Sequence, residues 1–327
     1  MERVLGLNKV EFIQDQPSYR TFYNQAKGNP KNYPDLLDHL DTEYVILQGP
    51  LFTINFPNIW RKSFEAYKRK GVKVILLSSA FFRHNNEELE STIKFLKEFP
   101  PFLITTRDEV TFKKLQNSFD NVYNGIDSAF FVPKAYNPIK LDLAPYVVIN
   151  FDRWPEPRIS EESTAVDNNF SRRSFNWMNK TWNLEFPTFQ MKMADKNKWC
   201  SYIASAFDFR TLSSTFDNLQ VIRTEHRYTP HITFKIYKRP GAIVSDEPWT
   251  YFTVYANTSL TISDRVHACA MTLAYGNPAI LFTASPRSLL FERVGATHIR
   301  SSVTQLDLSY LDDEREKQID YLKQKIL

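Results

Sequence analysis

An arginine and a histidine, Arg265 and His267, stand two residues apart directly before an apolar stretch that ends at Gly276. An arginine side chain offers a planar fork of N–H donors that suits carboxylates and phosphates. A histidine can transfer a proton near neutral pH. The pair therefore indicates acid–base chemistry on an anionic ligand. The alternative is a surface arginine bonded to a neighbouring carbonyl group beside a surface histidine.

The residues after this pair predict the helix that must position it. Apolar residues from Val266 to Ala274 recur at intervals of three and four, so one helix face would pack on a sheet. Ser263 or Asp264 is suited to cap the start of this helix, and Gly276 its end. Residues two apart inside a helix point about 200° away from each other. Both side chains can face one ligand only if the helix begins around them.

Short apolar runs that alternate with amphipathic stretches predict an α/β fold around this helix. Residues 43–133 read β-α-β-α-β-α-β, the order of one doubly wound domain, with its last strand over residues 121–133. Prolines and the lack of periodicity over residues 134–145 indicate a linker. We therefore expect one domain of residues 1–138 and a second of residues 139–327, the latter with a polar terminal helix. Within the second domain we expect a helix over residues 198–209 and a strand over residues 231–237.

Composition excludes several classes of function. The chain has 327 residues and a net charge of +4, and it lacks the dense lysine and arginine stripes of nucleic-acid-binding proteins. Its two cysteines, Cys200 and Cys269, have neither metal-site nor disulfide spacing. No apolar run reaches the length of a membrane span, and the N-terminus does not resemble a signal peptide. We therefore expect a cytoplasmic protein with no nucleic-acid partner, no metal and no cofactor.

Several segments together resemble one family. Ser-Asp-Arg-x-His, an apolar helix, Gly-x-Pro and a buried strand resemble the C-terminal signature of the polysaccharide pyruvyl transferases. "ITTRDEVTFKKLQ" is similar to the family's strand, Arg-Asp and helix element, and "NVYNGIDSAFFVP" to its following strand. "EYVILQGPLF" resembles the family's glycine-rich strand and loop, although only Gly49 of the usual glycines is present. The family's N-terminal strand is not recognisable in residues 1–30, and the resemblance covers roughly residues 43–133 and 258–296.

This resemblance implies two Rossmann-like domains that face a cleft, as in the GT-B glycosyltransferases. The domain of residues 1–138 would lie on the acceptor side and the domain of residues 139–327 on the donor side. It implies transfer of a pyruvyl group from phosphoenolpyruvate onto two hydroxyls of a sugar, forming a cyclic ketal in a surface or capsular polysaccharide precursor. The partners would be phosphoenolpyruvate and a saccharide or lipid-linked saccharide acceptor. A lipid-linked acceptor would add a peripheral contact with the inner face of the cell membrane.

The resemblance also implies roles for individual residues. Arg265 would hold the anionic donor and His267 would be the acid or base. Arg107 would reach across the cleft from the other domain, against the alternative of a surface pair with Asp108 or Glu109. Asp127 would orient a sugar hydroxyl or cap a turn.

The remaining candidate contacts to substrate are Gly49, Asp264, Ser285 and Arg287. Arg287 follows the predicted strand "PAILF", where another anion contact would lie at the carboxyl edge of the sheet, and Ser285 could cap the next helix. The alternative for Arg287 is a solvated surface arginine.

Residues 152–200 hold four of the six tryptophans together with several arginines. We interpret this stretch as core or as an acceptor loop with flat faces for sugar rings. Two other functions remain open for the whole chain: a GT-B-type nucleotide-sugar glycosyltransferase and a non-catalytic carbohydrate-binding protein.

Overall fold

The computed structural model describes residues 1–6, 9–13, 36–161, 168–196, 200, 203, 208, 210–225, 236–283 and 285–327. They form two compact units. The first comprises residues 1–128, 292–294 and 309–327, and the second residues 129–291 and 295–308. The chain thus enters the second unit before residue 138, and the terminal helix belongs to the first unit, whereas the sequence placed it in the second.

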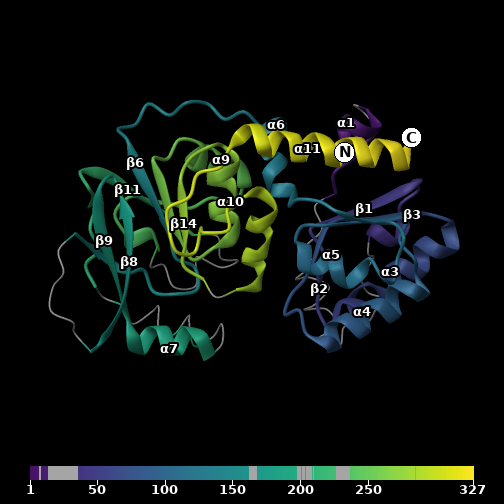
Figure 1. The fold of residues 1–327 in the computed structure, drawn as a ribbon, viewed down its shortest axis with the longest axis horizontal. Helices are drawn as coiled ribbons and strands as arrows, with labels where there is room; N and C mark the ends of the chain where they lie inside the picture. The colour runs from purple at the N-terminus through teal and green to yellow at the C-terminus, as the bar shows by residue number, and fades with distance from the viewer. Residues whose placement is uncertain are drawn as a thin grey trace. The chain divides into compact units, whose positions relative to one another are not determined.

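The first unit is built on a parallel sheet of strand order β1-β3-β4-β5, with the short strand β2 paired to the end of β3. Figure 1 shows helices α3, α4 and α5 on one side of this sheet. The strands are β1 (Tyr44–Gln48), β2 (Leu51–Phe52), β3 (Lys73–Phe81), β4 (Leu103–Thr106) and β5 (Val122–Asn124). The helices are α3 (Phe56–Lys70), α4 (Asn86–Glu98) and α5 (Glu109–Leu115), with the short α1 (Glu2–Leu5) and the 3₁₀ turn η2 (Leu36–His39) before them.

Capping residues explain where these helices begin and end. The Asn85 and Asp108 side chains accept hydrogen bonds from the backbone three residues on, which fixes the starts of α4 and α5. Gly71 ends α3 in the left-handed conformation that glycine adopts at little cost. The helices pack on the sheet through an aromatic cluster that includes Phe64 and Phe95.

The terminal helix α11 (Leu308–Ile326) packs on the other side of the same sheet (Figure 1). The Gln318 side chain accepts a hydrogen bond of 2.7 Å from the backbone N–H of Ile126, and the rings of Tyr123 and Tyr321 stack at 4.2 Å. These contacts assign the helix to the first unit. Sequence periodicity shows that a helix exists, but it does not show which sheet the helix covers.

The second unit has a six-stranded sheet of order β10-β11-β6-β13-β14, with β12 paired to β11, and only β10 runs antiparallel. Its strands are β6 (Tyr146–Asn150), β10 (Thr215–Phe216), β11 (Leu219–Thr224), β12 (Ala242–Ile243), β13 (Leu260–Ser263) and β14 (Ala279–Leu281). Its other elements are η3 (Ser128–Phe131), α6 (Val132–Ala135), η5 (Ile236–Lys238), α9 (Pro248–Ala256), α10 (Val266–Ala274) and η6 (Pro286–Val294). Two largely parallel sheets with helices confirm the expected α/β class with two Rossmann-like domains.

The tryptophan-rich stretch forms a separate three-stranded antiparallel sheet in the order β7-β9-β8, followed by a helix. These elements are β7 (Arg158–Ser160), β8 (Phe170–Trp177), β9 (Lys180–Pro187) and α7 (Thr188–Lys196). Trp154 and Trp182 are buried in the core of the second unit, so for them the core interpretation is confirmed. Trp199 lies outside the described residues.

Other elements differ from the expectations. The strand expected over residues 121–133 ends at Asn124, and the rest forms the 3₁₀ turn η3 and helix α6. The Pro at the second position of α6 suits a helix start and removes a donor that a strand would need. The strand expected over residues 231–237 ends in a 3₁₀ turn, and its first five residues lie outside the described ranges, as does most of the helix expected over residues 198–209.

Candidate active site

Helix α10 begins later than the sequence indicated. Its N-cap is Arg265, in an extended conformation, and neither Ser263 nor Asp264 holds that position. The Ser263 hydroxyl instead accepts a hydrogen bond of 2.8 Å from the backbone N–H of Arg265. Arg265 therefore stands outside the helix and His267 is its second residue. The condition for both side chains to face one ligand, a helix that begins around them, is met.

His267 contacts Arg287, another residue that the sequence predicts for the site. Nη2 of Arg287 lies 3.2 Å from Nδ1 of His267. Arg287 is held at the start of η6, where its backbone N–H donates to the Ser285 hydroxyl over 3.3 Å. Arg287 is therefore partly buried and in contact with His267, and its role as an anion contact stays a prediction. Ser285 supports the turn that carries Arg287, as a capping residue would.

Arg265 is fixed by an acid that the sequence did not single out. Its Nη1 donates to Oδ2 of Asp152 over 2.6 Å. The Asn150 amide donates to the other oxygen of Asp152 over 3.1 Å, so the carboxylate itself is oriented. The Arg265 side chain remains 39% exposed. Asp152 thus orients the guanidinium, and part of that group remains accessible to solvent.

Asp264 organises the turn that carries Asp152. Its carboxylate accepts three backbone hydrogen bonds, from Asp152 at 2.9 Å, Arg153 at 2.8 Å and Trp154 at 2.6 Å. Burial, reinforced by the nearby charge of Asp152, raises the pKa of Asp264 to about 7, although the three backbone bonds act in the opposite direction. The geometry gives Asp264 a positioning role beside the site. Contact between Asp264 and substrate stays a prediction.

These residues meet at one edge of the second sheet. Strands β6, β13 and β14 are parallel neighbours, and Asp152, Arg265 and Arg287 each follow the carboxyl end of one of them. Ligands of open α/β sheets bind at this edge. The first N–H groups of α10 point toward the same region and favour an anion. Two arginines, a histidine and a helix N-terminus together suit a small ligand with a carboxylate and a phosphate.

A second charged pair lies in the first unit. Nη1 of Arg107 lies 2.9 Å from Oδ2 of Asp127, and both side chains are almost fully buried. The alternative of a surface pair with Asp108 is wrong, because Asp108 caps α5 through the backbone and hydroxyl of Thr111. The structure therefore brings together Arg107 and Asp127, which the sequence treated separately.

Gly49 follows β1 with a φ of 66° and has open space where a Cβ atom would lie. Its backbone N–H donates to the carbonyl group of Leu77 over 2.7 Å. The positive φ accounts for glycine at this turn. Contact between Gly49 and substrate stays a prediction.

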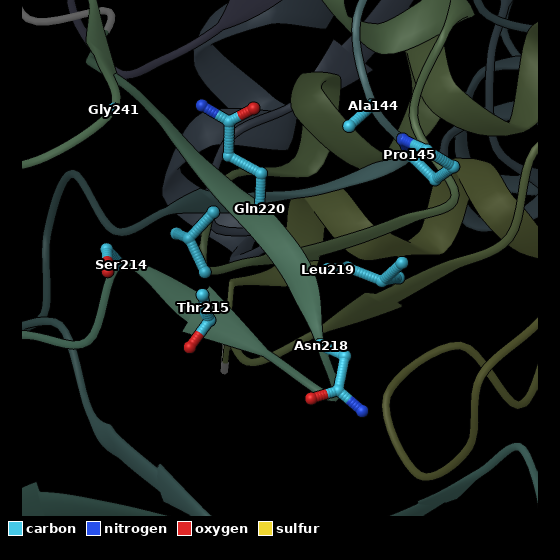
Figure 2. A pocket seen from close by; sticks show the side chains of 9 residues that line it. Ala144, Pro145, Ser214, Thr215, Asn218, Leu219, Gln220 and Gly241 are labelled. Carbon is cyan, nitrogen blue, oxygen red and sulfur yellow. The ribbon is translucent and has the colours of Figure 1, made fainter.

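A pocket of about 400 Å³ lies elsewhere in the second unit (Figure 2). Pro145, Leu219, Gln220 and Gly241 are among its lining residues, so it opens near the amino ends of β6 and β11. None of its lining residues carries a charge. This pocket is therefore separate from the candidate site at the carboxyl edge.

The described ranges contain no helix that combines the length and the apolar character needed to cross a membrane. In the same ranges, no three histidine, cysteine, aspartate or glutamate side chains gather as a group that could hold a metal ion. A reaction without metal or cofactor stays a prediction.

Sequence reasoning missed two residues. Asp152, the partner of Arg265, follows the strand of residues 146–150, and an acid at the carboxyl end of a strand was the available signal. His84 follows β3 and precedes α4, and its ring nitrogen Nδ1 is buried. A histidine between a buried strand and a helix start was the signal there.

Solved structures that match the chain include proteins bound to UDP or UDP-GlcNAc. The structure of S. aureus MnaA with UDP is 9% identical, with a TM-score of 0.49, and the match covers 99% of this chain and 80% of that chain. UDP-GlcNAc 2-epimerase from Neisseria meningitidis, bound to UDP-GlcNAc, is 11% identical with a TM-score of 0.43, and the match covers 98% and 78%. The Methanocaldococcus jannaschii enzyme with UDP-GlcNAc and UDP is 10% identical with a TM-score of 0.44, covering 93% and 72%. No curated protein sequence matches the chain.

One family model covers most of the chain. It describes polysaccharide pyruvyl transferase and matches residues 4–286. The matched range includes the ion pair of Arg107 with Asp127 as well as Arg265 and His267. The chain belongs to the polysaccharide pyruvyl transferase family.

Proposed function

We propose that this protein transfers a pyruvyl group from phosphoenolpyruvate onto two hydroxyls of a saccharide and forms a cyclic ketal. The observation that carries the proposal is the placement of Arg265, His267 and Arg287 after β13 and β14, at the edge where α/β sheets bind ligands. Family membership supports a pyruvyl transferase acting on a polysaccharide. Phosphoenolpyruvate as donor and the ketal product are the further content of the proposal.

The donor carries two anionic groups, and the second unit offers two arginines for them. Arg265 would bind one group through the face of its guanidinium that Asp152 leaves accessible. Arg287 would bind the other, together with the first N–H groups of α10. The two arginines neutralise the donor's charge in this scheme, so no metal is assigned a role.

The reaction begins with a proton that moves to the methylene carbon of phosphoenolpyruvate. The neighbouring carbon becomes oxocarbenium-like, and the first sugar hydroxyl adds to it and loses its proton. The bond between this carbon and the bridging oxygen of the phosphate group then breaks, inorganic phosphate leaves with that oxygen, and the second hydroxyl adds to the same carbon. The two hydroxyls thus release two protons. One balances the proton placed on the methylene carbon and the other leaves with phosphate.

His267 is the proposed proton donor, and its contact with Arg287 sets a condition on that role. Arginine has no acceptor atom, so Nδ1 of His267 accepts the bond and the ring proton is on Nε2. This neutral ring cannot readily give up its last proton. We therefore assign Arg287 a second role. When it turns to the donor's anionic group, Nδ1 is released and the ring can take up the proton that it later delivers.

Ligand-induced stabilisation tests the proposal against its alternatives. A ligand that binds only the folded protein raises its melting temperature in proportion to the logarithm of its concentration over Kd. Phosphoenolpyruvate should stabilise the protein, and Arg265→Ala should lose most of that shift. Stabilisation by UDP alone would favour a nucleotide-sugar glycosyltransferase. Saccharide binding without phosphate release from phosphoenolpyruvate would favour a non-catalytic carbohydrate-binding protein.

A further inference from the structure

Three neighbouring strands of the second sheet end on buried polar residues. β6 ends at Asn150, β11 at Thr224 and β13 at Ser263. β6 lies between the other two strands, and Asn150 is the register partner of Ser263. The side chain of Asn150 has no exposed surface. A buried amide is costly unless its donors and its acceptor are all bonded, so the contacts of Asn150 have to be accounted for one by one.

Every polar group of the Asn150 side chain has a partner. Nδ2 donates to the carbonyl group of Thr224 over 2.7 Å and to Oδ1 of Asp152 over 3.1 Å. Oδ1 accepts a hydrogen bond of 3.0 Å from the hydroxyl of Ser263. A carbonyl group and an ionised carboxylate can only accept, so the amide cannot be turned the other way round. Asn150 thus joins both neighbouring strands to an acid in the loop that follows β6.

One of these contacts leads to the side chain of Arg265. Oδ2 of Asp152 accepts from Nη1 of Arg265 over 2.6 Å, and Oδ1 of the same carboxylate accepts from Asn150. A carboxylate can rotate about the bonds of its side chain. When one oxygen is held, the direction in which the other accepts is held as well. Asn150 therefore sets the direction from which Asp152 binds the guanidinium of Arg265.

A second contact leads to the backbone of Arg265. The hydroxyl of Ser263 donates to Oδ1 of Asn150 and accepts from the backbone N–H of Arg265 over 2.8 Å. A hydroxyl has a single hydrogen, so the bond to Asn150 decides which lone pairs are turned toward Arg265. The backbone N–H of Asp264 also donates to the carbonyl group of Asn150, over 3.1 Å. Because Arg265 stands between β13 and α10, these bonds fix the point from which its side chain leaves the backbone.

We propose that Asn150 is a positioning residue for Arg265, acting on its side chain through Asp152 and on its backbone through Ser263. Asn150 is fully buried, so it acts through these two residues and not on the ligand. An amide suits this place because it donates and accepts at once, whereas a carboxylate would lose both donors. The positioning of Arg265 is independent of the proposed function, and only the choice of phosphoenolpyruvate as the ligand rests on it.

The first test observes Arg265 in the whole protein without a ligand. NMR with isotope-labelled arginine measures the rotation of each guanidinium about its Nε–Cζ bond, and the signal absent from Arg265→Ala identifies Arg265. A charge-assisted bond to a fixed carboxylate slows this rotation. The rotation should be several-fold faster in Asn150→Ala than in the parent.

The matched control is Thr272→Val. It removes another buried hydrogen bond of the same unit, the bond of 2.7 Å between the hydroxyls of Thr272 in α10 and Thr261 in β13. Neither hydroxyl takes part in the contacts of Asn150. The control should leave the rotation of Arg265 unchanged.

The second test measures the binding of phosphoenolpyruvate in a double-mutant cycle. Asn150→Ala should weaken binding by about tenfold, and Thr272→Val should not weaken it. In the Arg265→Ala background, Asn150→Ala should change binding by less than about twofold, because the residue that it positions is absent. A general loss of structure would instead weaken binding equally in both backgrounds. Asn150→Ser, which can keep one of the hydrogen bonds, takes the place of Asn150→Ala if that variant does not fold.

Unchanged rotation of Arg265 in the Asn150 variant would overturn the inference, as would an equal loss of binding with and without Arg265. A lower melting temperature with unchanged rotation would assign Asn150 to the fold alone, and failure of both Asn150 variants to fold would do the same. The proposed function fails in a different way. If the parent does not bind phosphoenolpyruvate but Arg265 rotates faster in Asn150→Ala, the positioning role stands and only the ligand is wrong.

Discussion

Nη2 of Arg287 lies 3.2 Å from Nδ1 of His267, and only the histidine can accept in this contact. The bond therefore holds the neutral ring with its proton on Nε2. The protonation state of His267 would therefore depend on the position of Arg287. A donor anion that draws the arginine away would make Nδ1 available for protonation. In the proposed reaction, the binding of phosphoenolpyruvate would thus prepare His267 to act as the acid.

We expect His267→Gln to lower turnover by about 10²-fold or more, the usual contribution of a general acid. The apolar face of α10 from Val266 to Ala274 carries the packing, so the melting temperature should stay close to that of the parent. Paired measurements of turnover and melting temperature check this. Normal turnover in the variant, or a large loss of stability, would assign His267 a structural role.

We expect Arg265→Lys to weaken donor use almost as much as Arg265→Ala does. An ammonium group cannot reproduce the planar fork that Asp152 orients. The KM for phosphoenolpyruvate should rise at least about tenfold in both variants, a loss of about 1.4 kcal/mol. Arg69→Lys, at an exposed position of α3, is the matched control and should leave KM unchanged. A near-normal KM in Arg265→Lys would show that only the charge matters.

We expect Asp264 to make stability depend on pH. Its pKa is raised from 3.8 to about 7 in the folded protein, so folding favours the protonated form. The contribution of the protonated Asp264 to the free energy of unfolding is complete below about pH 4, and it is lost as the pH rises toward 7. Melting temperatures of the parent and of Asp264→Asn should therefore converge or cross over this window, the parent losing stability relative to the variant. Parallel curves would show that Asp264 is already charged at low pH.

We expect Asp127→Asn to destabilise the first unit by about 3–5 kcal/mol, because it leaves the buried charge of Arg107 without its partner. The double variant Arg107→Met with Asp127→Leu should recover most of that stability, since apolar replacements of a buried ion pair are often tolerated. It should not recover turnover. Urea unfolding of the three proteins checks the first part. A double variant that is stable and also retains turnover would show that the pair has no part in the reaction.

The periodicity of the sequence was enough to predict the order of strands and helices in the first unit. Residues 43–124 alternate as expected because the helices pack an apolar face on the sheet and the central strands β3 and β4 are largely buried. The extent of the last strand was not predictable in the same way. Apolar residues after Asn124 suit a strand or a helix equally well, and tertiary packing decides between them.

The sequence also placed the main residues of the site at the correct edge, because strand ends can be located from the pattern. It could not supply their partners. The bond between Arg265 and Asp152 joins residues 113 apart in the chain, and that between Arg107 and Asp127 depends on the register of neighbouring strands. The sequence pattern suggested Asp264 as a helix cap, but its carboxylate accepts hydrogen bonds from the backbone of a turn more than a hundred residues away, at Asp152 and Trp154. Such contacts are set by the sheet order, which local patterns do not contain.

The most direct test of the account is the product formed from phosphoenolpyruvate and a methyl hexoside in heavy water. We predict release of inorganic phosphate in equal amount to a product that exceeds the hexoside by the mass of pyruvic acid less water, increased by the mass difference of one deuterium for hydrogen. Because a solvent-derived proton moves to the methylene carbon, that product should carry one carbon-bound deuterium in its methyl group. A product without the ketal mass, or phosphate released with no change in the hexoside, would contradict the account.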